Sequence, residues 1–235
     1  MITNSPADQW TDTNDQDFSG EDAGVGEMRE LIKATVSAYY TDKIKQHGPT
    51  AQGVDWNSIE SQELRFWQLT RIIDRDPGFS LNDYGCGYGA LVPFLASRFS
   101  SFEYCGFDWS KSMIEEANRL YSDRSRCRFV AENELMQPAD YTIASGIFNV
   151  KLGHRDADWQ RYILDVLHKL DTLSTGGFSF NILTSYSDPE RQRGDLFYGD
   201  PCFFFDYCKR QFSRNVALLH DYGLYEFTVL VRKQS

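Results

Sequence analysis

The sequence has few cysteines, and their spacing matches no metal-binding pattern. The five cysteines are Cys86, Cys105, Cys127, Cys202 and Cys208, and no two of them form a C-x-x-C pair. Scattered cysteines of this kind are typical of reduced thiols that serve as small apolar residues. The sequence therefore predicts neither a disulfide framework nor a metal site.

Long apolar runs and basic clusters are also absent. No stretch approaches the roughly 20 apolar residues of a membrane span, and the N-terminus lacks the basic and apolar parts of a signal peptide. These absences predict a soluble, cytoplasmic protein with no membrane partner. The net charge is −10, and no basic footprint of a nucleic-acid binder is present. DNA and RNA are therefore disfavoured as substrates.

Basic residues are missing altogether from the first part of the chain. Residues 1–28 hold seven carboxylic side chains and no Lys or Arg. An acidic segment without hydrophobic periodicity is typical of a disordered, solvated tail, which we expect over residues 1–26. For residues 27–235 we expect a single domain, since a chain with 41% hydrophobic and 15% aromatic residues can form a large core.

Two helices are predicted ahead of the first strand. Apolar residues recur at helical spacing over residues 27–46, and the pattern stops at His47, Gly48 and Pro49. A second helix is predicted over residues 58–75, closed by Asp76, Pro77 and Gly78.

Beyond residue 79 the chain alternates between strand-like and helical patterns, which predicts an α/β fold with a parallel sheet and crossover helices. The predicted strands cover residues 80–84, 103–108, 127–132, 141–146 and 177–183, and the predicted helices cover 90–99, 111–122 and 158–173. An insertion over 184–205 then precedes a short helix over 206–212. Two strand-like runs, 215–222 and 225–232, predict a final antiparallel hairpin that turns at Gly223 and Leu224.

The most specific signal is the glycine-rich segment after the first predicted strand. Asp83 is followed by Gly85, Gly87 and Gly89, and Asp108 ends the next strand. Alternate glycines allow a tight turn and a close approach to a ligand, and they are expected to leave free N–H groups at the start of a helix. A carboxylate about 20 residues further on accepts hydrogen bonds from ribose hydroxyls. The expected ligand is an adenosine derivative.

Asp83 distinguishes between adenosine derivatives. Its carboxylate would repel the negatively charged pyrophosphate of NAD but would attract a cation. The spacing of the glycines also differs from the G-x-G-x-x-G of dinucleotide sites. The pattern D-x-G-x-G-x-G, followed by G-x-D-x-S at Gly106–Ser110, resembles motifs I and II of the class I methyltransferases that depend on S-adenosylmethionine (SAM). The resemblance implies a Rossmann-like, seven-stranded, mostly parallel sheet with an antiparallel C-terminal hairpin, with SAM as cofactor and S-adenosylhomocysteine as product.

The resemblance also implies roles for residues of the glycine loop and of the second strand. Asp83 would meet the ammonium of SAM, and the backbone of Gly85, Cys86 and Gly87 would meet the rest of its methionine part. Asp108 would bind the ribose.

Further cofactor contacts are implied on the elements that follow. The residues expected near the adenine are Trp109, Met113, Glu132 and Asn133, and those expected near the sulfonium are Ser145 and Gly146. Arg65, on the second helix, could bind the SAM carboxylate bidentately, although a surface salt bridge is an equally good interpretation of that residue.

The acceptor pocket and the base are predicted less specifically. The first two helices, within residues 27–78, and the segment 184–212 would cover the site. Its expected acceptor-facing residues are Tyr39, Tyr40, Trp56, Asn149, Tyr186 and Tyr198. A histidine with a pKa near 7 could remove a proton from the acceptor, and the candidates are His154, His47 and His220. Each could equally be a hydrogen-bonded structural residue.

The function predicted first is methyl transfer from SAM to an oxygen or nitrogen of a small molecule, such as a sugar-containing or secondary metabolite. Three alternatives remain open at this point. One is a protein methyltransferase, and another is a SAM-binding protein without catalysis. The third is an NAD-dependent oxidoreductase, which the missing dinucleotide spacing disfavours.

Overall fold

The protein is built on one seven-stranded sheet. A computed structural model describes residues 23–56, 58–131 and 136–233. The strand order is β3-β2-β1-β4-β5-β7-β6. Strand β7 is antiparallel to both of its neighbours, and the other neighbouring strands pair in parallel. The strands are β1 (Phe79–Tyr84), β2 (Phe102–Phe107), β3 (Cys127–Val130), β4 (Ala139–Ala144), β5 (Ser174–Leu183), β6 (Asn215–Leu219) and β7 (Glu226–Arg232). The predicted mostly parallel sheet with an antiparallel C-terminal hairpin is confirmed.

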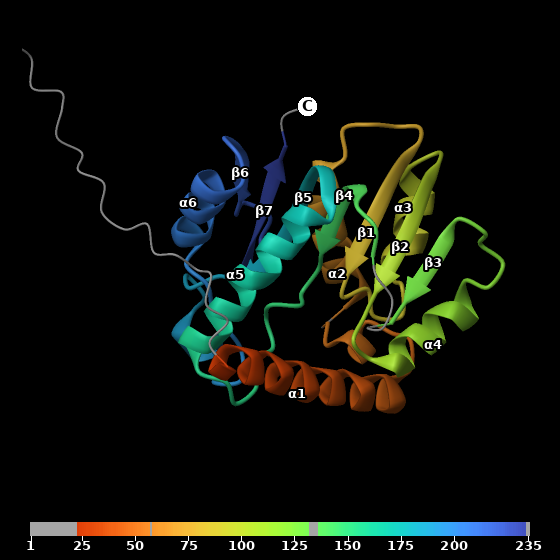
Figure 1. Ribbon diagram of the computed structural model, residues 1–235. Helices are drawn as coiled ribbons and strands as arrows, with labels where there is room; N and C mark the ends of the chain where they lie inside the picture. The colour runs from red at the N-terminus through yellow and green to blue at the C-terminus, as the bar shows by residue number, and fades with distance from the viewer. Residues whose placement is uncertain (1–22, 57, 132–135, 234–235) are drawn as a thin grey trace, which may run out of the picture.

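Helices cover both faces of the sheet and the end at which its parallel strands finish. Residues of α2, α3 and α4 belong to the hydrophobic cluster on one face, and residues of α5 and α6 belong to the cluster on the other. Helix α1 runs across the carboxyl ends of the parallel strands (Figure 1). The α-helices are α1 (Ala23–His47), α2 (Ile59–Leu69), α3 (Leu91–Arg98), α4 (Lys111–Leu120), α5 (Asp156–Thr172) and α6 (Pro201–Gln211).

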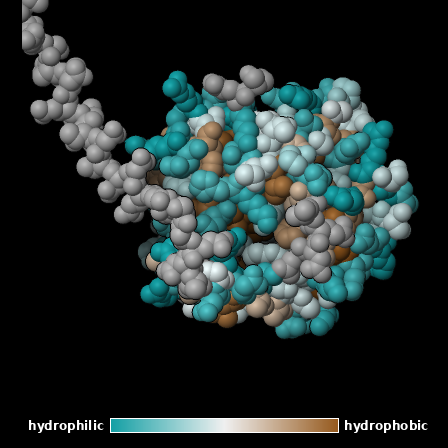
Figure 2. All heavy atoms as spheres, in the orientation of Figure 1, coloured by the Kyte–Doolittle hydropathy of each residue, from teal (hydrophilic) through white to brown (hydrophobic). Residues whose placement is uncertain are grey.

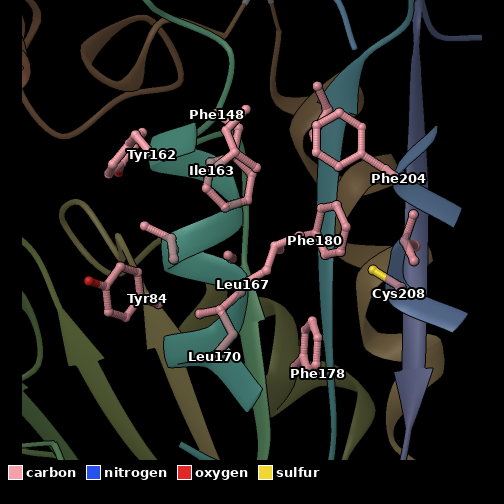
Figure 3. Packing of buried hydrophobic residues seen from close by; sticks show 14 of the residues in the cluster. Tyr84, Phe148, Tyr162, Ile163, Leu167, Leu170, Phe178, Phe180, Phe204 and Cys208 are labelled. Atoms are coloured by element: carbon pink, nitrogen blue, oxygen red, sulfur yellow. The ribbon is translucent and has the colours of Figure 1, made fainter. Parts of the chain in front are cut away.

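The larger core cluster lies between β5 and the helices α5 and α6. Figure 3 shows Ile163 and Leu167 of α5 facing Phe180 of β5, with Phe204 of α6 on the other side of that ring. All four side chains are fully buried. Because these apolar side chains are removed from water, their burial stabilises this face of the sheet. On the outside of this face, hydrophilic residues cover most of the surface (Figure 2).

The predicted tight hairpin is wrong in its details. Strand β6 ends at Leu219, which pairs with Thr228, so residues 220–225 form a longer connection than the two-residue turn expected at Gly223 and Leu224. Within this connection the hydroxyl of Tyr222 lies 2.9 Å from that of Thr228. His220 therefore lies outside β6 and is exposed.

Other boundaries differ for reasons of helix capping. Helix α6 begins at Pro201 rather than at residue 206, because Asp200 accepts a hydrogen bond from the Cys202 amide at 2.8 Å and Pro201 fits the first helical turn. Helix α1 begins at Ala23, inside the segment expected to be a tail. Helix α2 ends at Leu69 and continues only as a 3₁₀ turn, Thr70–Ile72. None of the described helices has both the length and the apolar composition needed to span a membrane.

Candidate functional site

A cavity opens where strands β1, β2 and β4 end. It holds about 860 Å³ of empty space, including the part open to solvent. Its walls come from the ends of these strands, from α1 above them and from the segment that leads into α2. The lining residues are Val36, Ser37, Tyr40, Val54, Trp56, Gln62, Phe66, Asp83, Tyr84, Gly85, Cys86, Gly87, Ala90, Leu91, Phe107, Asp108, Trp109, Met113, Ser145, Gly146, Ile147 and Tyr162.

Asp83 gives the cavity a buried carboxyl group. Strand β1 places it on the cavity wall, and it is 3% exposed. Burial, with a smaller contribution from the nearby Asp108, raises the pKa of Asp83 to about 7, although a hydrogen bond from the Tyr104 hydroxyl at 2.7 Å acts in the opposite direction. No Lys, Arg or His is among the described residues that line the cavity. A cationic ligand would therefore supply the charge partner that Asp83 otherwise lacks.

Asp108 joins the glycine loop to the start of α4. Its carboxylate accepts hydrogen bonds from the Gly87 amide at 2.9 Å and from the Ser110 amide at 2.8 Å. Burial raises its pKa to about 6, and these backbone hydrogen bonds act in the opposite direction. The carboxylate is half-buried at the cavity wall, so it can also accept from a ligand hydroxyl.

The backbone amides of the glycine loop are hydrogen-bonded within the protein, although they were expected to be free. The amides of Gly85 and Cys86 both donate to the Phe107 carbonyl, at 2.7 and 2.9 Å, and the Gly87 amide is bound to Asp108. The prediction that these N–H groups are free is therefore wrong. A pyrophosphate needs free amides at such a loop, whereas an ammonium needs acceptors, which Asp83 provides.

The segment after β4 offers an unsatisfied polar atom. The Oγ atom of Ser145 is buried and has no hydrogen-bond partner within the described structure, although it lines the cavity. Such an atom is costly unless a ligand or water satisfies it. The next residue must be glycine, because its φ is +73° and an added Cβ would lie 2.2 Å from the Trp56 ring. Trp56 thus packs directly onto Gly146.

Helix α1 is fixed over the cavity by side-chain hydrogen bonds. The hydroxyl of Thr41 lies 2.8 Å from that of Ser110, which caps α4, and the Ser37 hydroxyl donates to the Trp109 carbonyl at 3.3 Å. These contacts place Tyr40 of α1 opposite the end of β2.

Most of the predicted cofactor residues come together at this cavity. Those that line it are Asp83, Gly85, Cys86, Gly87, Asp108, Trp109, Met113, Ser145 and Gly146. Glu132 and Asn133 lie outside the described residues. Their assignment to the adenine stays a prediction.

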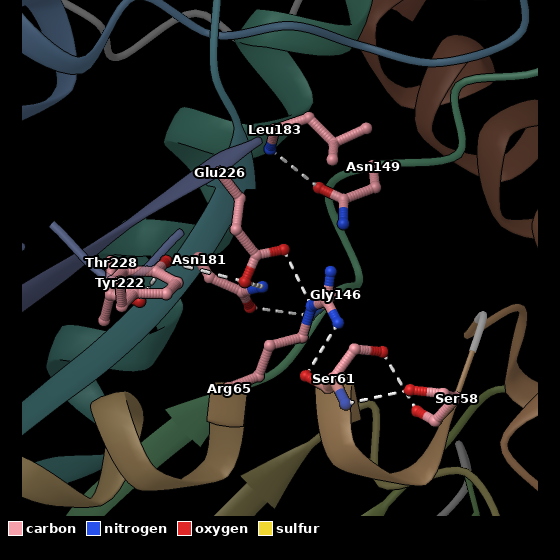
Figure 4. Close-up of polar contacts among 10 residues, drawn as sticks. All are labelled: Ser58, Ser61, Arg65, Gly146, Asn149, Asn181, Leu183, Tyr222, Glu226 and Thr228. Carbon is pink, nitrogen blue, oxygen red and sulfur yellow. Dashed lines mark hydrogen bonds and ion pairs between the residues drawn. The ribbon is translucent and has the colours of Figure 1, made fainter. Parts of the chain in front are cut away.

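Arg65 has a protein partner rather than a place on the cavity wall. Its Nε donates to Glu226 of β7 at 2.7 Å (Figure 4). Its guanidinium lies 4.0 Å from the centre of the Trp56 ring. This pair is buried, so the surface salt bridge considered for Arg65 is not what the structure shows. Binding of the SAM carboxylate by Arg65 stays a prediction.

Two of the six residues predicted to face the acceptor line the cavity, namely Tyr40 and Trp56. Tyr39 instead donates to Asp55 at 2.8 Å, and the side chain of Asn149 accepts from the Leu183 amide at 3.1 Å. The other two belong to the insertion, where Tyr186 is 69% exposed and Tyr198 contacts the Arg193 amide. The insertion packs beside residues 149–152 through main-chain hydrogen bonds, next to the cavity rather than on its wall.

None of the candidate base histidines lines the cavity. His154 contacts the Thr35 hydroxyl at 2.8 Å, one residue before the cavity-lining Val36. His47 is exposed at the end of α1, and His220 packs against Tyr186 and Phe227. A catalytic role for any of the three stays a prediction.

Several cavity residues were not predicted from the sequence. Val36, Val54, Gln62, Phe66 and Tyr162 each carry an ordinary core or surface pattern, and only the spacing of Val36, Ser37 and Tyr40 along one side of α1 could have indicated them. A second hollow, of about 1100 Å³ including open space, shares Tyr84, Phe107, Trp109 and Tyr162 with the first.

Comparisons with known proteins agree with this geometry. A family model described as a methyltransferase domain matches residues 82–171. The "Putative methyltransferase Rv1506c" of Mycobacterium tuberculosis (strain ATCC 25618 / H37Rv) is 50% identical over 165 residues, which cover 70% of this chain and 99% of that protein.

Among solved structures, the fold is similar to a DhpI–SAM–HEP complex, with a TM-score of 0.58 and 12% identity over 91% of this chain and 100% of that one. It is also similar to human N-acetylserotonin methyltransferase in complex with SAM, with a TM-score of 0.52 and 15% identity over 88% and 68% of the two chains. The relative at 50% identity shows that the chain belongs to the methyltransferase family, and the solved structures show that its fold is the one found in SAM-dependent methyltransferases.

Proposed function

We propose that this protein transfers a methyl group from SAM to an oxygen or nitrogen atom of a small molecule. The observation that carries the cofactor part is the buried carboxyl of Asp83 in a cavity whose described walls hold no cationic side chain. An ammonium group of the ligand would pair with it. Asp108, whose carboxylate lies at the cavity wall, would accept from the ribose hydroxyls, and the unsatisfied Ser145 hydroxyl would make a further polar contact.

When bound, SAM supplies a methyl carbon activated by the positive charge on its sulfur. The protein's own residues then bind and orient the cofactor and exclude water, which is most of what an in-line displacement requires. Tyr40 of α1 and Trp56 of the covering segment enclose the cavity beside the Ser145–Gly146 wall.

The enclosure of the cavity supports a small acceptor. It is roofed by α1 and by residues 51–56, and most of its lining is apolar or aromatic. A protein methyltransferase would require an open groove for a chain segment. Metabolites with an apolar body are therefore the acceptor class we propose, and sugar-containing or secondary metabolites remain its most suitable members.

The side chains on the cavity wall also indicate which acceptor atoms could react without a strong base from the protein. Burial raises the pKa of both Asp83 and Asp108, and no described histidine lines the cavity. An acceptor whose nucleophile carries a free lone pair near neutral pH, such as an unprotonated amine or an ionised oxygen, needs no strong base from the protein.

The first test is a calorimetric titration of the purified protein with SAM, S-adenosylhomocysteine and NADH, followed by transfer of labelled methyl groups to a panel of small molecules and, separately, to proteins. We expect binding of the first two ligands without NADH, and labelling of small molecules only. Labelled protein would indicate a protein methyltransferase. Cofactor binding with no acceptor in either panel would indicate a SAM-binding protein without catalysis.

A substitution tests the ribose assignment. We expect Asp108→Ala to weaken binding of SAM at least about tenfold, because a charge-assisted hydrogen bond contributes about 1.5–3 kcal/mol. Calorimetry of the variant provides the measurement. An unchanged affinity in a folded variant would contradict the placement of the ribose.

A further inference from the structure

A buried polar network lies behind the cavity wall and connects four parts of the chain. Its centre is Glu226 of β7, which is fully buried. One oxygen accepts from Arg65 of α2 at 2.7 Å, and the other accepts from the side-chain amide of Asn181 of β5 at 3.1 Å. Asn181 in turn accepts from the Gly146 amide at 2.8 Å (Figure 4).

Arg65 extends this network to the cover of the cavity. Its guanidinium stacks on Trp56 at 4.0 Å and donates to the Ser61 carbonyl at 2.8 Å, at the start of α2. Because the guanidinium is planar and delocalised, it can hold the carboxylate through its edge while its face supports the aromatic ring. The orientation of Trp56 therefore depends on a partner of Arg65 in another part of the fold.

Both walls held by this network belong to the cofactor cavity, whereas Glu226 does not. Trp56 and Gly146 line the cavity and pack on each other. Glu226, Asn181 and Arg65 lie behind them. A buried ion pair contributes little to stability when an apolar pair of similar volume could replace it, so its orienting effect is the more informative property.

We propose that Glu226 is a positioning residue for cofactor binding, which holds Trp56 through Arg65 and the Gly146 amide through Asn181. This inference rests on the proposed function, because the cavity it shapes is the one assigned to SAM. The Glu226 carboxylate thereby positions two adjoining walls of the cavity, although it does not line the cavity itself.

The proposal predicts that stability and cofactor affinity can be separated. Glu226→Gln keeps the shape but removes the charge, and it can impair folding by leaving Arg65 unpaired. The double variant Arg65→Met with Glu226→Leu replaces the pair by apolar side chains and is expected to fold. We expect both variants to bind S-adenosylhomocysteine about tenfold more weakly or worse, and the double variant to do so with a melting temperature close to that of the unchanged protein.

A matched control is available on α6. Arg210 donates from its Nε to Asp206 at 2.7 Å, the same donor atom and distance as in the buried pair, but this pair is exposed and none of its residues lines the cavity. We expect Asp206→Asn to leave the affinity for S-adenosylhomocysteine unchanged.

A double-mutant cycle tests whether Glu226 acts through Trp56. If it does, Trp56→Phe and Glu226→Gln together should weaken binding by less than the product of their separate factors, with a difference of about threefold or more. Simple multiplication of the two factors would overturn the route through Arg65.

Hydrogen exchange of the ligand-free protein keeps this inference distinct from the proposed function. We expect faster exchange in peptides covering residues 51–56 and 145–149 of the double variant, with unchanged exchange over Pro201–Gln211. Failure of the unchanged protein to bind SAM or S-adenosylhomocysteine would reject the proposed function, whatever the exchange shows. Exchange and affinity equal to those of the Asp206→Asn control would reject the positioning role.

Discussion

At the scale of single residues, Asp83 combines an energetic cost with a binding role. Its pKa of about 7 shows that the folded protein disfavours its ionised form, because the carboxylate is buried without a cation. A ligand ammonium offsets that cost when it binds. The residue is thus better suited to the complex than to the ligand-free protein, as is common where binding sites retain unfavourable groups.

This argument predicts opposite effects of Asp83→Asn on stability and on binding. At pH 8 the variant avoids a buried negative charge, so we expect the free energy of unfolding to rise by at least about 1 kcal/mol, or roughly 2–4 °C in Tm. Affinity for SAM should fall at least about tenfold, because the partner of the ammonium is lost. Thermal unfolding and calorimetry on the same samples measure both effects. A variant that is less stable and binds SAM normally would rule out this role.

The sequence allowed the residues of the cofactor motifs to be predicted better than those that position them. Asp83 and Asp108 are recognisable because a local pattern of glycines and strand ends surrounds them. Arg65 and Glu226 are 161 positions apart, and no local pattern indicates that they pair. The insertion was expected to cover the site, but packing against residues 149–152 places it beside the cavity.

At the scale of secondary structure elements, α4 connects helix capping to the cofactor site. Ser110 caps this helix, its amide donates to Asp108, and its hydroxyl contacts Thr41 of α1. Ser110 therefore connects the start of α4, the Asp108 carboxylate proposed to bind the ribose, and the helix that covers the cavity.

We expect Ser110→Ala to lower the free energy of unfolding by about 1 kcal/mol, the usual effect of losing an N-cap side chain, and to weaken binding of S-adenosylhomocysteine several-fold as α1 loses its contact. Asp200→Ala, which removes the cap of α6, should have a similar effect on stability and none on affinity. Denaturant unfolding and calorimetry distinguish the two. Equal losses of affinity in both variants would show that only general destabilisation is involved.

Element boundaries were predicted where the sequence contains a local stop or start signal. The strands that bear the motifs were found because apolar runs alternate with helical patterns. The start of α6 was missed because the aromatic residues of its first turns were assigned to the insertion, although Asp200 and Pro201 carry a capping signal. The longer β6–β7 connection includes a side-chain contact between Tyr222 and Thr228, which a pattern of strand-forming residues cannot indicate.

At the scale of the whole molecule, buried carboxyls make stability depend on pH. The pKa values of Asp83, near 7, and Asp108, near 6, lie above the ordinary value of 3.8, and burial also raises the pKa of Glu226. Between pH 4 and 7 the folded state therefore binds more protons at Asp83 and Asp108 than the unfolded state does. By linkage, the stability that these two groups contribute is fully present below about pH 4 and is lost as the pH rises through 6 and 7.

The ligand-free protein should consequently lose stability on going from pH 5 to pH 8, by an amount on the order of 1–3 kcal/mol from Asp83 and Asp108 together. Exposed carboxyls paired with arginine, such as Glu116 and Asp158, have lowered pKa values and change stability only in the more acidic range. We expect the Asp83→Asn variant to lose less stability between pH 5 and pH 8 than the unchanged protein does.

Binding of S-adenosylhomocysteine should reverse this dependence, because its ammonium favours the ionised form of Asp83. A ligand that binds only the folded state stabilises it by about 2.7 kcal/mol at a concentration of 100 times its Kd. Since ionisation of Asp83 improves the affinity, a fixed ligand concentration should raise Tm more at pH 8 than at pH 5. Unfolding curves with and without ligand at both values measure the difference. An equal rise at both pH values, in the unchanged protein and in Asp83→Asn alike, would mean that the ligand does not contact this carboxylate.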